Sequence, residues 1–271
     1  MALACPSNFD TNSLRDQVRA TYEMVASNPE GDFHFHRGAA YAVHYLGYDD
    51  QELKQLPNIA TERFAGVGNP IAIADSNPAL GVIRDGQLVL DHACGAGMDV
   101  LLAARRVGEH GRVIGVDMTP AMCHKARQAV EQAGMSPIVD IREGVYEQLP
   151  VEDSCIDVVI SNGVINLAPD KQQVFQEINR VLKPGGYLLL ADVVVQRELT
   201  LDARSSPELW AACVGGALVE DELYSLARQV GLMNGAVVKR FNCFYNTSAE
   251  HKVAKDLFVH SVNFVARKPE K

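Results

Sequence analysis

Residues 88–97 read Leu-Val-Leu-Asp-His-Ala-Cys-Gly-Ala-Gly, and this stretch decides the fold of the chain. Three apolar residues lead into Asp91 and a loop of small residues, and the apolar run 100–104 follows at once. This order is typical of a buried strand, a tight turn and the start of a helix. The glycines Gly95 and Gly97 let the backbone approach a ligand where a Cβ would intrude. A second apolar run, 112–116, ends in Asp117, an acid that can accept both hydroxyls of a ribose. The pattern favours a nucleoside-containing ligand.

Two kinds of ligand compete for this loop. A dinucleotide site requires the pattern G-x-G-x-x-G, but Met98, Asp99 and Val100 follow Gly97, so the third glycine is missing. Asp99 would also repel a pyrophosphate. Asp91 and Asp99 instead suit a ligand with a cationic end, such as the amino group and sulfonium of S-adenosylmethionine (SAM). A purely structural strand-turn-helix unit is the remaining alternative.

Length and charge restrict the class of protein. The chain has 271 residues, 47% of them hydrophobic, which is ample for a folded core. Its net charge of −9 and the absence of a Lys/Arg cluster argue against nucleic acid and anionic membranes as partners. Residues 1–10 show no signal-peptide pattern, and no apolar run approaches the roughly 20 residues that span a bilayer. We expect a soluble cytoplasmic protein that acts on a small molecule; the sequence does not indicate its oligomeric state.

Strand and helix patterns alternate from residue 87 onward. The predicted strands are 87–91, 112–116, 137–142, 156–161, 186–193, 236–243 and 257–267, and the predicted helices are 98–108, 119–133, 171–182 and 220–230. This rhythm predicts a doubly wound α/β fold, with a parallel sheet covered by helices on both faces. Thr119-Pro120 is typical of a capped helix start, and residues 183–186 of a turn.

Residues 1–80 form a separate region in this interpretation. Helical spacing at 14–28, 37–47 and 50–56 predicts an N-terminal helical cap, followed by a SAM-binding domain over 81–271. A looser stretch, 197–219, reads as an insertion on the substrate side. Asp91, Asp117 and Asn162 all fall at predicted strand ends, where ligands of such sheets bind.

Histidine and cysteine supply the candidate reactive groups. The six cysteines contain no C-x-x-C pair, so most are expected to be small buried hydrophobes. His34 and His36 are candidates for a general base, or else surface or packing residues. A third ligand for a His-x-His metal site is not evident, so no metal is expected.

The motifs together resemble those of class I SAM-dependent methyltransferases. The matching segments are 90–97, 115–120, 149–150 and 181–186. The resemblance implies a Rossmann-like seven-stranded sheet whose last pair is antiparallel. Segments 113–122 and 160–167, with Gly68-Asn69-Pro70 and Trp210-x-x-Cys213, resemble the arsenite methyltransferase family more narrowly.

This resemblance assigns roles to residues of this chain. The loop 91–97 would hold the methionine part of SAM, through Asp91, Ala93, Gly95 and Gly97. Asp117 would accept the ribose hydroxyls, Met118 would pack on adenine, Gly144, Val145 and Tyr146 would line its edge, and Asn162 would contact the amino acid end. The substrate pocket would comprise Val67, Asn69, Gly163, Asn166, Trp210 and Cys213.

Two of the three arsenic-binding cysteines of that family are replaced here, by Val67 and Gly163, while Cys213 remains. Soft trivalent arsenic prefers two or three thiolates. The leading interpretation is therefore methyl transfer from SAM to a small-molecule acceptor, such as an organic compound of secondary metabolism. The alternatives are a metalloid or small-thiol methyltransferase and a non-catalytic SAM-binding protein. Cys213 is a substrate contact, a nucleophile or a packing residue in these interpretations.

Overall fold

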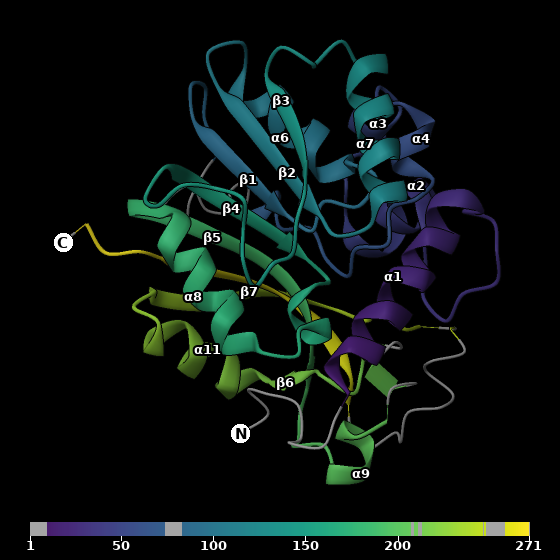
Figure 1. The fold of residues 1–271 in the computed structure, drawn as a ribbon, viewed down its shortest axis with the longest axis vertical. Helices are drawn as coiled ribbons and strands as arrows, with labels where there is room; N and C mark the ends of the chain where they lie inside the picture. Colours follow the sequence, from purple (N-terminus) through teal and green to yellow (C-terminus); the bar gives the residue numbers. More distant parts are fainter. Residues whose placement is uncertain are drawn as a thin grey trace.

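Eight strands form one sheet, in the order β3-β2-β1-β4-β5-β8-β7, with the short β6 paired to β5 (Figure 1). The structure is a computed structural model that describes residues 10–73, 83–206, 209–210, 213–245, 247 and 258–270. The strands are β1 (Leu88–His92), β2 (Arg112–Asp117), β3 (Val139–Glu143), β4 (Ile156–Asn162), β5 (Leu182–Val195), β6 (Leu218–Val219), β7 (Met233–Phe241) and β8 (His260–Arg267).

The strand directions confirm the predicted fold class. β1 to β5 run parallel to one another, whereas β8 runs antiparallel to both β5 and β7. The seven strands of the main path match the expected sheet with its antiparallel final pair. The eighth strand, β6, has only two residues and extends the edge of β5 at Val194 and Val195. A two-residue strand has no periodicity by which a sequence pattern could reveal it.

Helices cover both faces of the sheet. Alternate residues of each strand point to opposite faces, so Val89 joins one core while Leu90 joins the other. The first core includes α6 (Met98–Val107) and α7 (Pro120–Gln132), and the second includes α8 (Lys171–Val181) and α11 (Glu220–Gln229). The parallel strands β1, β2 and β4 are therefore buried on both sides, as their nearly continuous apolar runs predict, whereas the edge strand β3 alternates between buried and exposed residues.

The N-terminal helices gather beside α7 (Figure 1). They are α1 (Thr11–Ser27), α2 (Gly38–Tyr41), the π-helical turn η1 (Ala42–Leu46), α3 (Asp50–Leu53) and α4 (Asn58–Thr61). The Asp10 side chain caps α1 by accepting hydrogen bonds from Asn12 and Ser13. Both α1 and α4 pack on α7. These helices therefore lie next to α7, the helix that follows Asp117 in the chain.

Two local predictions were wrong in part. Residues 183–186 follow the end of α8 at Val181, as predicted, but they belong to β5 rather than to a turn, and a register shift there lets Tyr187 pair with Val158. The Thr119 hydroxyl does not cap α7; it is hydrogen-bonded to the Asp117 carboxylate instead. Its backbone N–H also donates to Asp117, at 2.8 Å. The Asp117 carboxylate thus takes the Thr119 hydroxyl that was expected to cap α7.

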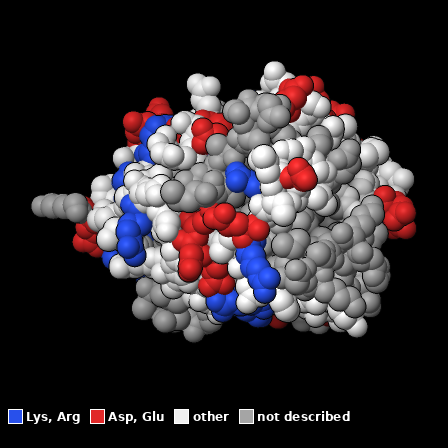
Figure 2. All heavy atoms as spheres, turned by 90° about the horizontal axis from the view of Figure 1, so that it is seen from below, with Lys and Arg blue, Asp and Glu red and all other residues white. Residues whose placement is uncertain are grey.

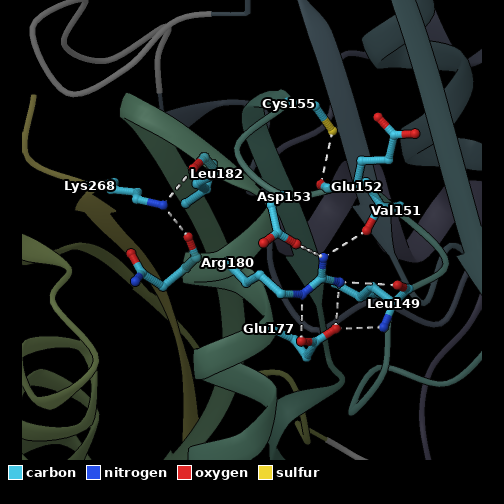
Figure 3. A network of polar contacts seen from close by, with 10 residues as sticks. Leu149, Val151, Glu152, Asp153, Cys155, Glu177, Arg180, Leu182 and Lys268 are labelled. Carbon is cyan, nitrogen blue, oxygen red and sulfur yellow. Dashed lines mark hydrogen bonds and ion pairs between the residues drawn. The ribbon is translucent and has the colours of Figure 1, made fainter.

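The guanidinium of Arg180 ties the segment between β3 and β4 to α8 (Figure 3). It donates to Glu177 at 2.7 Å and to the carbonyl oxygens of Val151 at 2.8 Å and Leu149 at 3.1 Å, and it pairs with Asp153 at 2.6 Å. Burial alone would raise the pKa of Glu177, but hydrogen bonds from Arg180 and Leu149 hold it below its usual value. This network fixes the path of the segment that leads from β3 past the site.

Charges of both signs occupy the face shown in Figure 2, where Lys and Arg side chains are interspersed with Asp and Glu. None of the helices in the described part of the chain is long and apolar enough to cross a membrane.

Candidate functional site

A cavity lies at the carboxyl ends of β1, β2 and β4, with about 870 Å³ of empty space including its open mouth. The ends of these strands, the loops after them and the N-terminal segment form its wall. The lining residues are Val18, Tyr22, Ala60, Arg63, Phe64, Ala65, Gly66, Asp91, Ala93, Cys94, Gly95, Ala96, Met98, Asp99, Val116, Asp117, Met118, Thr119, Met122, Gly144, Tyr146, Asn162, Gly163, Val164 and Leu167. This position is where ligands bind in open α/β sheets.

The loop between β1 and α6 shapes one wall through left-handed backbone. Ala93, Gly95 and Gly97 have φ values of 64°, 52° and 91°. A Cβ placed on Gly95 would meet no atom within 4 Å, so the space beside this residue is open to a ligand. Ala93 adopts the same region with a side chain, which costs about 1–2 kcal/mol. The tight turn therefore keeps Ala93 in a strained left-handed conformation.

Three buried carboxyl groups face this cavity: Asp91, Asp99 and Asp117. Burial raises the pKa of Asp91, and the negative charges of Asp99 and Asp117 raise it further. One of its oxygens, Oδ2, is buried without a hydrogen-bond partner. An unpaired buried carboxylate oxygen is costly unless a cation or donor arrives to satisfy it. The site thus has one unsatisfied acceptor, suited to a positively charged group of a ligand.

Asp117 at the end of β2 holds the two neighbouring loops together. Its Oδ2 accepts a hydrogen bond from the N–H of Gly95 at 2.9 Å, and its Oδ1 accepts one from the N–H of Thr119 at 2.8 Å. Burial raises its pKa, and these hydrogen bonds oppose that shift. Each carboxylate oxygen has a second lone pair, so the group can still accept from ligand hydroxyls.

Asp99 belongs to a latch between the N-terminal region and the sheet. It accepts hydrogen bonds from the Tyr48 hydroxyl at 2.8 Å and from Asn162 Nδ2 at 3.0 Å. Asn162 Oδ1 in turn accepts from the N–H groups of Val67 at 2.9 Å and Gly68 at 3.3 Å. Burial raises the pKa of Asp99 to about 6 against the effect of these bonds. The latch fixes the loop 66–68 against the end of β4.

Val67 and Gly163, the two replaced positions, lie against each other. Gly163 has a φ of 77°, and a Cβ added to it would lie 3.4 Å from Val67 Cγ1. Val67 is buried in an apolar cluster that also contains Cys213, Trp210 and Leu167. Position 67 therefore adjoins position 163, and it shares an apolar cluster with Cys213.

Most of the predicted cofactor residues line the cavity, and the others lie outside its lining. Those that line the cavity are Asp91, Ala93, Gly95, Asp117, Met118, Gly144, Tyr146 and Asn162. Gly97 instead opens α6, and Val145 forms a bridge with Gln148. Of the predicted substrate residues, only Gly163 lines the cavity. The roles assigned to these residues stay predictions.

The remaining substrate candidates lie behind the cavity wall. Asn69 is buried in a turn where its side chain bonds Gly47 and Ala72. Asn166 donates from Nδ2 to Asp192 at 2.8 Å. Trp210 is fully buried and donates from Nε1 to the Arg204 carbonyl at 2.7 Å.

The candidate histidines lie apart from the cavity lining. His36 stacks on Tyr41 and Tyr45, and its Nε2 lies 2.6 Å from the Tyr245 carbonyl oxygen. His34 packs edge-on against Phe35 at 4.8 Å between ring centroids. Within the described part of the chain, no group of three or more His, Cys, Asp and Glu side chains could hold a metal ion.

Sequence reasoning assigned Val67 and Asn69 of the N-terminal region to the pocket but missed the residues of that region that line it. Tyr22, Arg63 and Gly66 line it, and Tyr48 bonds its carboxylate Asp99. The two glycines Gly66 and Gly68 were a visible sign that this loop could approach a ligand. Tyr22, by contrast, fitted the apolar spacing of a helix and gave no separate indication.

Comparisons with known proteins agree with this geometry. A family model described as a methyltransferase domain matches residues 83–231. An arsenite methyltransferase of Halobacterium salinarum is 42% identical over 186 residues, 69% of this chain and 45% of that protein. The human arsenite methyltransferase is 40% identical over 151 residues, 53% of this chain and 40% of that protein.

A solved structure extends the similarity to three dimensions. An arsenic(III) S-adenosylmethionine methyltransferase from Chlamydomonas reinhardtii matches with a TM-score of 0.67 and 34% identity, covering 80% of this chain and 71% of that chain. The chain spans less than half the length of the two curated relatives, 45% and 40%.

Proposed function

This chain belongs to the class I SAM-dependent methyltransferases, close to the arsenite methyltransferases, and we propose that it transfers the methyl group of SAM to a small-molecule acceptor. The single observation that carries the proposal is the set of three buried carboxyls around the glycine loop. In particular, Asp91 lines the cavity and its buried Oδ2 has no hydrogen-bond partner, so it would accept from the positive end of SAM.

The residues present fit SAM. Asp91 would pair with the α-amino group, and the open space beside Gly95 would admit the methionine part. Asp117 would accept the ribose hydroxyls. Met118, Gly144 and Tyr146, with Val145 behind them, would enclose the adenine. Asn162, held by the latch, would position the loop 66–68 against the amino acid end.

Positioning is the main work of the protein in this proposal. Bound SAM supplies an electrophilic methyl group on a sulfonium, and the protein holds the acceptor in line with it in a dry site. An acceptor that needs no deprotonation needs no general base. This agrees with the position of His34 and His36 away from the cavity lining.

Two acceptor classes remain, each with its own observation. Val67 and Gly163 make the acceptor side apolar, which favours an organic acceptor. The relatives named arsenite methyltransferase and the retained Cys213 favour a soft metalloid or a small thiol. In either case, residues 1–80 would act as a cap over the SAM domain 81–271, and the insertion 197–219 would close the acceptor side.

The proposal is tested by the formation of S-adenosylhomocysteine from SAM with a panel of acceptors: arsenite, methylarsonous acid, small thiols, phenols and amines. We expect turnover with at least one acceptor. Asp117→Ala should abolish SAM binding by calorimetry, and the exposed Asp140→Asn should not. SAM binding without turnover on any acceptor would favour the non-catalytic alternative, and failure to bind SAM would refute the proposal.

A further inference from the structure

We propose that Arg63 binds the carboxylate at the amino acid end of SAM, which makes the N-terminal region part of the cofactor site. The inference rests on the proposed function and deepens it by naming the residue that recognises this group. Asp91 would pair with the α-amino group of SAM, and the carboxylate is attached to the same carbon atom. A ligand with both groups is best matched by an acid and a base in the same wall.

The cavity wall carries one cationic side chain. Arg63 is the only Lys, Arg or His among the described residues that line the cavity, whereas three carboxyl groups line it, those of Asp91, Asp99 and Asp117. SAM is positive at its sulfonium and amino group and negative at its carboxylate. The acids match the positive groups, and in this wall only Arg63 has the charge that matches the negative one.

Hydrogen bonds to two backbone carbonyls hold the Arg63 guanidinium. Its Nε donates to the Ala26 carbonyl oxygen at 2.8 Å, and its Nη1 donates to the Ile59 carbonyl oxygen at 3.2 Å. Ala26 lies in the last turn of α1, where helix carbonyls lack a partner within the helix, and Ile59 belongs to α4. Both helices pack on α7 (Figure 1). The side chain is therefore fixed by packed helices and does not depend on a ligand for its position.

Ala26 connects Arg63 to the glycine loop. It shares a small apolar cluster with Val25, Ala96 and Met122. Ala96 belongs to the loop between β1 and α6 that would hold the methionine part of SAM, and both Ala96 and Met122 line the cavity. Arg63 is thus anchored to the cluster that borders this loop.

The guanidinium keeps donors for a ligand. The Arg63 side chain is only 10% exposed, and its Nη2 makes no hydrogen bond within the described part of the chain. The Glu62 carboxylate lies 3.6 Å from Nη1, but it is 52% exposed and too distant for a hydrogen bond. A nearly buried charge with unused donors is unfavourable. A carboxylate that accepts two parallel hydrogen bonds would satisfy it.

The segment after Arg63 is fixed as well, by the latch. A Cβ on Gly66 would collide with the Asn162 amide, and Asn162 Oδ1 accepts from the N–H groups of Val67 and Gly68. Arg63 therefore lies between two anchors, the end of α1 and the end of β4. A contact prepared in this way loses little binding energy to reorganisation when the ligand enters.

Calorimetry with a matched pair of ligands tests the contact. S-Adenosyl-3-methylthiopropylamine is SAM without its carboxylate, and it keeps the adenosine, the sulfonium and the amino group. The wild-type chain should bind SAM about 10- to 150-fold more tightly than this analogue, the range for a hydrogen bond to a charged group. Arg63→Gln should bind SAM more weakly by the same factor and bind the analogue no more weakly than wild type. S-Adenosylhomocysteine, which has the carboxylate but no sulfonium, should be weakened as SAM is.

Arg37→Gln is the matched control. Arg37 also donates to backbone carbonyls of the N-terminal region, those of Pro29 and Gly31, but it does not line the cavity. This variant should bind all three ligands as the wild type does. Thermal unfolding shows whether each variant is folded. If Arg63→Gln is not, Arg63→Lys replaces it; lysine keeps the charge without the planar fork and should retain only part of the preference for SAM.

Equal affinity of the wild type for SAM and the analogue, normal SAM binding by Arg63→Gln, or an equal loss of both ligands would overturn the inference. Normal SAM binding with impaired turnover of an acidic acceptor would also overturn it, because Arg63 would then belong to the acceptor side. Each of these outcomes leaves the proposed function standing. A wild-type chain that binds no SAM would refute the proposed function as well.

Discussion

The charge of Asp91 is the most direct test of the cofactor site, through the substitution Asp91→Asn. The side chain is 2% exposed, and its Oδ2 has no partner. Asparagine keeps the shape and removes the charge. A hydrogen bond to a charged group is worth about 1.5–3 kcal/mol. Since about 1.4 kcal/mol is a factor of ten, SAM should bind about 10- to 150-fold more weakly.

The same substitution should stabilise the chain without ligand. The pKa of Asp91 is raised by burial and then by Asp99 and Asp117, so ionising it in the folded state costs free energy. That cost is absent below its unfolded pKa of about 3.9 and is complete above the folded pKa. The gain in melting temperature from Asp91→Asn should therefore be present at pH 8 and vanish at pH 4.

Calorimetry with two ligands separates a specific contact from general damage. 5′-Methylthioadenosine has the adenine and ribose of SAM but no amino acid, so Asp91→Asn should bind it as the wild type does. Asp117→Asn, in contrast, should weaken both ligands. The reasoning would be refuted if Asp91→Asn bound SAM normally, or lost both ligands equally while remaining folded.

Three further outcomes are expected. SAM affinity should rise between pH 5 and 7, because burial raises the pKa of Asp99 to about 6 and only its ionised form attracts the ligand cation; calorimetry across pH checks this. Ala93→Gly should stabilise the chain by about 0.5–1 kcal/mol in denaturant unfolding, because relief of the left-handed strain exceeds the entropy cost of glycine. Val67→Cys, which adds a thiol beside Gly163 in the cluster that holds Cys213, should raise arsenite binding, measured by the fluorescence of Trp210, the single tryptophan of the chain.

The sequence pattern predicted those strands and helices that depend on short-range hydrophobic periodicity. The apolar run ending at Asp91 had to be a buried strand, and the parallel neighbours then had to bring Asp117 and Asn162 to the same edge of the sheet. The parallel direction of the first strands followed from these points, whereas the strand order was not predicted. Motif resemblance supplied the antiparallel pair formed by β7 and β8.

Contacts between residues distant in the sequence were not predicted. The latch joins Tyr48, Asp99 and Asn162 across separations of 51 and 63 residues. Nothing in the sequence near Tyr48 distinguishes it from a packing residue. Thr119 shows the converse: a good local capping signal gave way to a carboxylate two residues away.

Two observations bear on the acceptor side of the cavity: the residues at positions 67 and 163, and the similarity to arsenite methyltransferases. The resemblance to arsenite methyltransferases places two of that family's three arsenic-binding cysteines at positions 67 and 163, where this chain has Val67 and Gly163. A Cβ on Gly163 would lie 3.4 Å from Val67 Cγ1, so the two positions adjoin and neither carries a thiol. Similarity to the relatives named arsenite methyltransferase nevertheless argues for a soft acceptor. Arsenite, methylarsonous acid and organic acceptors compared side by side would separate these two constraints, because only a soft acceptor should depend on Cys213.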